Sequence, residues 1–337
     1  AAGRYTDYDK AYKLFDKLIE NKSRARQQFI GNHKAYLNAI KHKMEVSAQL
    51  DEMWQSGFEE LEVKALSDGD RISPWETVMH ISGDASLFAH LETVYLGILA
   101  RRTKIASNVR SVVDAANGKI VLYFPARFDH WAVQGGDGYA AHIGGATGVS
   151  TDAQAQWWGA KASGTVPHAL IAAVGGDTVK AITLFGETYP DVDLVALVDF
   201  DNDSVGTSLK CCEALGDRLW GVRLDTSNTL VDKSIVPVMQ NFSPVGVTPQ
   251  LVEMTRKMLD RHGFSHVKII VSGGFHPNRI AGFEKLQVPV DAYGVGSYLM
   301  RGVNAFTADV VLLDGKPCAK VGREYQPNER LEVVNSR

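Results

Sequence analysis

Cysteine, charge of one sign and long apolar runs are all scarce in this chain of 337 residues. Its three cysteines form no CxxC pair and offer no disulfide framework, which excludes a small disulfide-stapled fold and indicates a reducing compartment. The formal net charge of -3 provides no overall field that would attract nucleic acid or an anionic membrane. No apolar run approaches the roughly 18 residues of a membrane span, and the first residues lack the apolar core of a signal peptide. We therefore expect a soluble cytoplasmic protein without a nucleic-acid or membrane partner.

Internal repeats and low-complexity segments are also absent, and the length allows about two domains. From residue 6 to about 48, apolar residues recur at helical spacing among Lys, Glu and Gln, which predicts helices. Strand-like segments follow at 58–63 and 78–83, and the longest helical pattern covers 86–115. These elements predict an N-terminal α+β open-sandwich domain over residues 1–116.

Short apolar segments alternate with helix-length segments after residue 117, which is typical of parallel β/α construction. An amphipathic helix is expected over 249–262, and strands are expected at 120–124, 194–199, 219–224, 267–271, 292–295 and 310–313. The spacing predicts an α/β fold with an irregular β/α barrel over 117–315. We expect the remaining residues, 316–337, to form a tail that packs back on the N-terminal domain.

Polar side chains follow several of the predicted strands, and the carboxyl ends of barrel strands meet at one rim, where barrel enzymes carry their active sites. Arg223 and Asp225 alternate along one strand, so they face the same side about 7 Å apart. They suit an anionic group and a pair of ribose hydroxyls, with a structural ion pair as the alternative. At another strand end, Phe124 can stack on a flat heterocycle and Arg127 can bind a carboxylate or phosphate, unless they are a core residue and a surface cation.

Aspartates, glycines and a histidine complete the candidate rim. Asp199 and Asp201 can position a sugar or hold Mg²⁺ indirectly, although clustered Asp and Asn residues are also common loop caps. His168 follows a loop-like segment, where it can serve as acid, base or phosphoryl acceptor or as a satisfied structural group. The glycine-rich segments after two late strands offer unobstructed backbone amides to a phosphate; they contain Ser272, Gly273, Gly274, Gly294, Gly296 and Ser297.

Taken in order along the chain, these motifs resemble nicotinate phosphoribosyltransferase, a type II phosphoribosyltransferase, in its short archaeal-like branch. The resemblance extends from about residue 6 to 331 and rests on Phe124-Pro125-Ala126-Arg127, Tyr139-Ala140-Ala141-His142-Ile143-Gly144-Gly145, Gly148-Val149-Ser150-Thr151, Gly164-Thr165-Val166-Pro167-His168-Ala169-Leu170, Arg223-Leu224-Asp225-Thr226 and Gly294-Val295-Gly296-Ser297. It implies a reaction of nicotinate with 5-phosphoribosyl 1-pyrophosphate, accompanied by Mg²⁺ and coupled to ATP. It also implies a homodimer with a shared site, in which the N-terminal domain caps the neighbouring barrel.

The resemblance also implies roles for individual residues. His168, Arg223 and Asp225 become the catalytic group, with His168 phosphorylated by ATP and Asp225 on the ribose. Phe124 stacks on the pyridine ring, Arg127 and Arg223 contact substrate carboxylate or pyrophosphate, and the glycine segments hold the 5-phosphate. The other substrate-binding residues are Ser150, Thr165, Asp199, Asp201 and, from the neighbouring subunit, Tyr8. No residue is predicted to bind a metal ion directly, and the Mg²⁺ is expected to arrive with the substrate.

Three other functions stay open at this point. Quinolinate phosphoribosyltransferase shares the expected architecture but needs a denser basic pocket for its dicarboxylate. A nicotinamide-specific transferase needs only a small change of the pocket. A non-catalytic nucleotide-binding relative would have little need to keep His168, Arg127, Arg223 and Asp225 together.

Overall fold

A computed structural model describes residues 3–31, 33–163 and 166–334, and the chain divides into two compact units. The first unit comprises the chain up to Gly97 and from Phe306 onward, and the second comprises Ile98–Ala305. The border therefore falls within the long helix α3 (Glu92–Ala115), whereas the sequence predicted borders at 116/117 and 315/316. The helical pattern of α3 continues without interruption, so nothing in it indicates where one unit ends.

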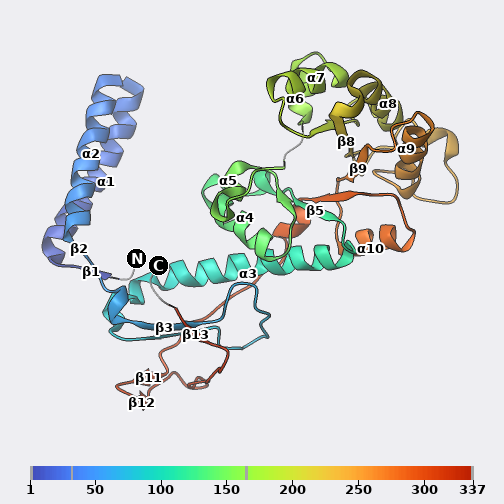
Figure 1. Cartoon of the computed structure of the whole chain (residues 1–337). Coiled ribbons are helices and arrows are strands. Elements are labelled where there is room, and N and C mark those ends of the chain that lie inside the picture. Colours follow the sequence, from blue (N-terminus) through green and yellow to red (C-terminus); the bar gives the residue numbers. More distant parts are fainter. Residues whose placement is uncertain (1–2, 32, 164–165, 335–337) are drawn as a thin grey trace. The chain divides into compact units, whose positions relative to one another are not determined.

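An antiparallel helix pair forms the first part of unit 1 (Figure 1). It consists of α1 (Tyr8–Gly31) and α2 (His33–Met53), as the helical pattern over 6–48 predicted. Apolar residues three, four or seven positions apart fall on one side of each helix and bury a small core of Ala11, Leu14, Val46, Leu50 and Met53. The strands β1 (Gly3–Tyr5) and β2 (Trp54–Ser56) pair antiparallel at the base of the two helices.

The second part of unit 1 is an antiparallel sheet in the order β13 (Glu332–Val333), β3 (Glu62–Ala65) and β4 (Met79–Ser82). The C-terminal segment thus pairs with the N-terminal sheet. A strand was expected from residue 58, but a 3₁₀ turn occupies Phe58–Glu60, where amide groups bond three residues back and leave no partner for a strand.

The expected barrel strand at 310–313 is wrong. Its last two residues form β11 (Leu312–Leu313), which pairs only with β12 (Lys316–Pro317) and lies in unit 1. Asp314 and Gly315 have φ values of 49° and 73°, the left-handed conformations that reverse the chain in a two-residue hairpin. The chain therefore reverses directly after Leu313, and β11 pairs with β12 of the same hairpin.

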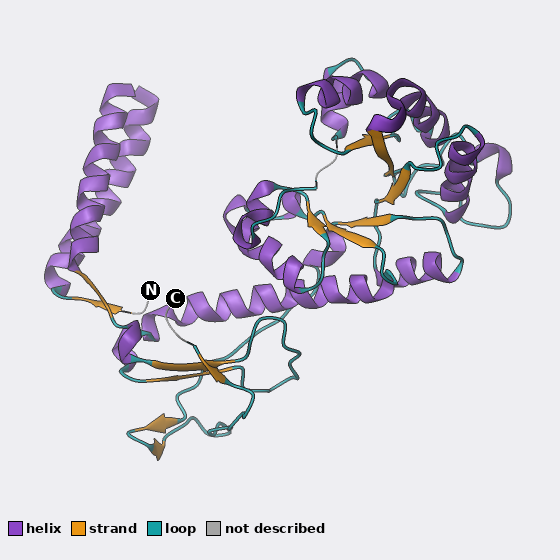
Figure 2. Ribbon diagram, in the orientation of Figure 1, coloured by secondary structure: helices purple, strands orange, loops and turns teal. Residues whose placement is uncertain are grey.

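Unit 2 is built on a curled parallel sheet of six strands, which confirms the predicted α/β class and irregular barrel (Figure 2). The sheet order is β6 (Gly148–Val149), β5 (Ile120–Tyr123), β10 (Ala292–Val295), β9 (Lys268–Val271), β8 (Leu219–Leu224) and β7 (Leu194–Leu197). Helices cover the sheet, so its strands are buried and read as nearly continuous apolar runs. β6 escaped the sequence analysis because two residues give no detectable pattern.

Side-chain caps mark the start of several helices of unit 2. The helix α7 (Thr178–Thr188) is capped by Asp177, α8 (Ser204–Leu215) by Asp203 and α9 (Pro249–Arg261) by Thr248, and each cap accepts a backbone N–H of the first turn. The others besides α3 are α4 (Gln134–Ile143), α5 (Asp152–Ala155), α6 (His168–Ala173) and α10 (Pro277–Lys285). The segments between the strands bring the chain back so that neighbouring strands run parallel, and the carboxyl ends of all six strands lie at the same edge of the sheet.

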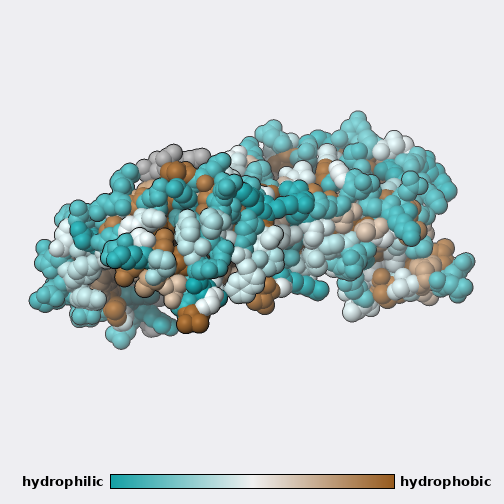
Figure 3. Space-filling view, turned by 90° about the horizontal axis from the view of Figure 1, so that it is seen from below, coloured by the Kyte–Doolittle hydropathy of each residue, from teal (hydrophilic) through white to brown (hydrophobic). Residues whose placement is uncertain are grey.

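The exterior is largely polar. Hydrophilic residues cover most of the face in Figure 3, and apolar residues emerge there in small separate groups. Within the described ranges, every helix is too short or too polar to cross a membrane.

Candidate active site

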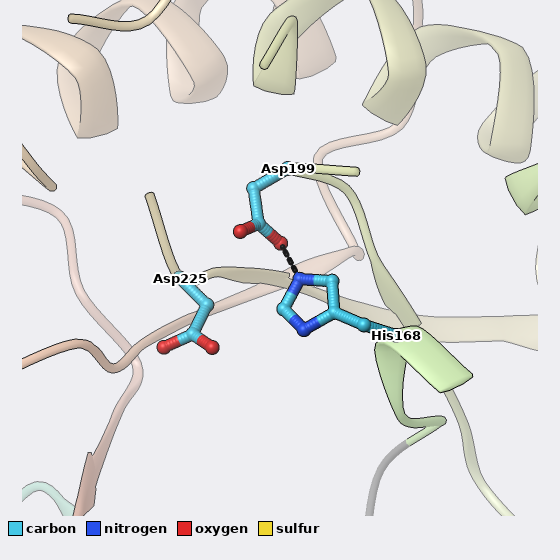
Figure 4. Close-up of side chains that lie close together, drawn as sticks. All are labelled: His168, Asp199 and Asp225. Carbon is cyan, nitrogen blue, oxygen red and sulfur yellow. Dashed lines mark hydrogen bonds and ion pairs between the residues drawn. The ribbon is translucent and has the colours of Figure 1, made fainter. Parts of the chain in front are cut away.

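One histidine and two aspartates converge at the carboxyl edge of the parallel sheet (Figure 4). His168 is the first residue of α6, Asp199 lies two positions beyond β7, and Asp225 directly follows β8. His168 Nε2 lies 3.0 Å from Asp199 Oδ1, and one ligand atom from each of the three residues lies within 4.8 Å of the others. The strand ends thus bring together three residues that are up to 57 positions apart, counting from 168 to 225.

The pKa of His168 is raised, chiefly because the hydrogen bond to Asp199 stabilises the imidazolium. Burial opposes this effect by disfavouring the charged ring, while the charges of Asp199 and Asp225 add to it. Asp225 is oriented in turn by Ser272, whose hydroxyl donates to Asp225 Oδ1 at 2.7 Å. The hydroxyl hydrogen of Ser272 is thus directed at a carboxylate, and phosphate binding at Ser272 stays a prediction.

A half-buried cation, Arg223, acts electrostatically on this cluster. The Arg223 guanidinium carbon is 5.6 Å from the centre of the Phe124 ring, and its Nε is buried without a hydrogen-bond partner in the part of the chain that the structure describes. Burial lowers the pKa of Arg223, while Asp225 and Asp199 act in the opposite direction and the positive charge of Arg127 adds to the lowering. A buried N–H without a partner is costly. A bound anion would supply that partner and would also relieve the repulsion between the two arginines.

Glycine has a packing role on β10. A Cβ at Gly294 would lie 2.5 Å from Phe124 Cε2, and one at Gly296 would lie 3.0 Å from Phe128 Cε2. Both glycines therefore make room for aromatic rings from the β5 end, and phosphate binding at them stays a prediction. Ser297 is exposed and opens a 3₁₀ turn, Ser297–Met300.

We expect Gly294→Ala to displace the Phe124 ring, because the new methyl group overlaps it. Overpacking of this kind costs about 1–3 kcal/mol of folding stability. Thermal denaturation measures the effect. Gly282→Ala is the matched control: it meets no atom within 4 Å on α10 and should stabilise the protein by up to about 1 kcal/mol. Equal melting temperatures for the two variants would contradict the prediction.

The loop after β9 has a left-handed backbone. Gly273 and Gly274 have φ values of 85° and 77°, which other residues rarely adopt. Arg279 fixes this loop by donating from Nη1 to the Gly273 carbonyl at 2.7 Å and from Nη2 to the Val247 carbonyl at 2.6 Å. Sequence reasoning missed Arg279, since no motif distinguishes it from other helical arginines.

Several predicted residues lie apart from the cluster. Asp201 lines a separate cavity of about 600 Å³ with Thr207 and Lys210. Tyr8 belongs to unit 1, where it is exposed and lies edge-on to Tyr5. Thr165 lies outside the described residues. Arg127 is exposed, with its guanidinium 5.6 Å from the centre of the Phe128 ring.

Comparison with known proteins finds relatives that match over most of the chain. Residues 24–103 match the family model described as quinolinate phosphoribosyl transferase, N-terminal domain. The nicotinate phosphoribosyltransferase pncB1 of Mycobacterium tuberculosis is 29% identical over 81% of this chain, and that of Bacillus subtilis is 25% identical over 70%. The chain spans 58% and 45% of the lengths of these two relatives.

Two solved structures share the fold of this chain. The nicotinate-nucleotide pyrophosphorylase from Pyrococcus furiosus is 36% identical with a TM-score of 0.67, over 82% of this chain and 68% of that one. Human nicotinic acid phosphoribosyltransferase shares the fold, with a TM-score of 0.53 at 18% identity over 70% of this chain and 55% of that one.

The fold and the site together define an α/β half-barrel protein with a polar cluster at the carboxyl ends of its strands. The chain belongs to the type II phosphoribosyltransferase family. The family resemblance inferred from the ordered motifs is thereby confirmed.

Proposed function

We propose that this protein is a nicotinate phosphoribosyltransferase, which joins nicotinate to 5-phosphoribosyl 1-pyrophosphate and yields nicotinate mononucleotide and pyrophosphate for NAD biosynthesis. The observation that carries the proposal is the half-buried Arg223, whose buried Nε has no partner among the described residues, beside the Phe124 ring and on the same strand end as Asp225. An aromatic face next to a cation with an unsatisfied buried N–H suits a flat ring that carries one carboxylate. The names of the M. tuberculosis and B. subtilis relatives support the same substrate.

The reaction needs orientation more than a nucleophilic side chain. Phe124 and Arg223 hold the base so that its ring nitrogen faces the anomeric carbon of the sugar. The bond from that carbon to the pyrophosphate oxygen breaks, its electron pair leaves with the pyrophosphate, and the nitrogen forms the new bond. Positive charge develops on the sugar during this exchange, and the carboxylate of Asp225 stabilises it while accepting hydrogen bonds from ribose hydroxyls.

The site also fits a divalent cation. Asp199 and Asp225 offer carboxylate oxygens, which Mg²⁺ prefers, within 4.8 Å of each other and of the His168 ring nitrogen. These two carboxylates would hold an Mg²⁺ that arrives with the phosphorylated substrate. The cation would neutralise charge on the departing pyrophosphate.

Coupling to ATP and assembly belong to the same proposal. His168 is the candidate phosphoryl acceptor, since it is partly exposed and oriented by Asp199. We also propose a cytoplasmic homodimer in which the N-terminal unit of one subunit caps the barrel of the other and Tyr8 reaches the shared site. Cross-linking from a cysteine at position 8 would test that assembly directly.

Quinolinate is the second candidate substrate, favoured by the description of the matching family model. Its second carboxylate would need a further buried cation. Arg127 is exposed and Arg279 is engaged by two backbone carbonyls, which argues for a single carboxylate at Arg223.

Pyrophosphate release with nicotinate, nicotinamide and quinolinate in parallel decides among the substrates. We expect nicotinate to exceed the other two by at least about 100-fold in kcat/KM, because only nicotinate pairs Arg223 without leaving a second charge unpaired. Each assay contains Mg²⁺ and 5-phosphoribosyl 1-pyrophosphate, and product identity is checked by mass spectrometry. Turnover of quinolinate alone would refute the proposal, as would binding of all three without release.

A further inference from the structure

A chain of buried amides connects the ends of β6 and β5. The Gln154 side-chain oxygen accepts from the Ser150 backbone N–H at 3.2 Å and from its hydroxyl at 3.0 Å. Gln154 Nε2 donates to Gln134 Oε1 at 2.8 Å, and Gln134 Nε2 donates to the Ala126 carbonyl at 3.0 Å. The two glutamines are 1% and 8% exposed, so water cannot easily replace these bonds.

The direction of the chain is fixed by its two backbone ends. The Ser150 N–H can only donate, so the oxygen of Gln154 must face it, and the Ala126 carbonyl can only accept, so the nitrogen of Gln134 must face that. A flip of either amide would therefore break at least two bonds. Ser150 commits its own hydrogen to Gln154, so any bond from Ser150 to a substrate uses the hydroxyl as acceptor.

The backbone around Gln154 is also held firmly. Its carbonyl accepts from Trp158 Nε1 at 3.0 Å, and its N–H is capped by the Thr151 hydroxyl at 3.4 Å. A Cβ at Gly138 would overlap the same carbonyl, so α4 and α5 approach as closely as a glycine allows. The hydrogen-bonded chain Ser150–Gln154–Gln134–Ala126, here called the amide relay, therefore connects the end of β5 to a backbone segment held by further hydrogen bonds.

The amide relay lies next to the residues proposed to bind the nicotinate ring. Val149 pairs with Tyr123, so Ser150 and Phe124 come next on adjacent strands. Ala126 lies between Phe124 and Arg127 in the chain and begins the 3₁₀ turn Ala126–Phe128, which carries Arg127 and follows Phe124 by two positions. A bond that holds the Ala126 carbonyl thus fixes this turn.

We propose that Gln134 and Gln154 are positioning residues, which set the base-binding turn 124–127 through the buried amide relay. The statement about the base rests on the proposed function, whereas the statement about the turn does not. Neither glutamine touches the substrate, and neither carries out a chemical step.

Gln134→Met tests the proposal, because methionine has nearly the same shape but cannot donate to Ala126. Gln156→Met is the matched control, because Gln156 is exposed, two positions beyond Gln154 at the start of the 3₁₀ turn Gln156–Trp158. Hydrogen exchange followed by mass spectrometry should show amides of residues 126–130 exchanging about tenfold faster in Gln134→Met only. The KM for nicotinate should rise about tenfold, with the KM for 5-phosphoribosyl 1-pyrophosphate within about twofold of wild type.

Hydrogen exchange tests the positioning role of the glutamines, and turnover of nicotinate by the wild type tests the proposed function. A wild-type protein that does not turn over nicotinate refutes the proposed function, and the exchange experiment still decides the relay. Unchanged exchange in residues 126–130 overturns the positioning role. Faster exchange spread equally over β9 and β10 also overturns it, because that result indicates general packing. Gln154→Met repeats the test from the middle of the relay and should give the same local pattern.

Discussion

Arg223→Ala is expected to lower kcat/KM for nicotinate by about 1,000-fold, an effect of the size seen when a charge-stabilising group is removed from an active site. The guanidinium lies beside Phe124, and both Asp199 and Asp225 lie close enough to act on its pKa. Its removal takes away the proposed partner of the substrate carboxylate and one of the positive charges near the two aspartates, the other being the His168 ring when protonated. Pyrophosphate release at varied nicotinate concentration measures the loss.

Companion variants distinguish this effect from loss of folding. Arg223→Lys keeps the charge but lacks the planar pair of donors, so it should recover only part of the activity. Arg261→Ala removes an exposed arginine at the end of α9 and should behave as wild type. If Arg223→Ala retains activity within about tenfold of wild type while remaining folded, the base does not bind at this arginine.

The convergence of His168, Asp199 and Asp225 was predictable, because the carboxyl ends of parallel strands share one edge. The position of Asp201 was not. Alternation would place Asp199 and Asp201 on one side, but β7 ends at Leu197, and the turn beyond it has Asn202 at a φ of 54° with its N–H on the Asp199 carbonyl. Strand periodicity no longer applies there, so Asp201 lines a different cavity.

Glycine motifs and isolated amides limited the sequence analysis in other ways. A glycine can serve a phosphate or a neighbouring ring equally well, and only the structure shows Phe124 against Gly294. The partners in the amide relay, Gln134 and Gln154, are 20 positions apart on different helices, and no spacing rule connects them. The half-barrel itself was predictable from short apolar segments that alternate with helix-length segments, which are local signals.

The proposed phosphoryl acceptor, His168, has the clearest expected dependence on pH. Asp199 raises the pKa of His168, so the ring stays protonated to a higher pH than a free histidine. Only the neutral imidazole can attack a phosphate, so the ATP effect should grow as pH rises through this raised pKa. Asp199→Asn should shift that rise to lower pH.

The free energy of unfolding should depend on pH in the opposite direction. The His168–Asp199 pair contributes stability at low pH, and this contribution is lost as pH rises through the raised pKa of His168.

His168→Ala is accordingly expected to abolish the effect of ATP and to spare basal transfer. In the proposed coupling, the bond between the γ-phosphorus and the bridging oxygen of ATP would break, ADP would leave with that electron pair, and a ring nitrogen of His168 would take the phosphoryl group. The added charge should reorganise contacts around Mg²⁺ and lower the KM for 5-phosphoribosyl 1-pyrophosphate. Arg223 and Asp225 remain in the variant, so transfer without ATP should stay within about tenfold of wild type.

Acid-labile phosphate should appear on the wild type and be absent from His168→Ala. The control is His266→Ala, which removes an exposed histidine and should keep the phosphate. ATP stimulation that survives in His168→Ala would place the nucleotide elsewhere and leave His168 as a residue that orients Asp199.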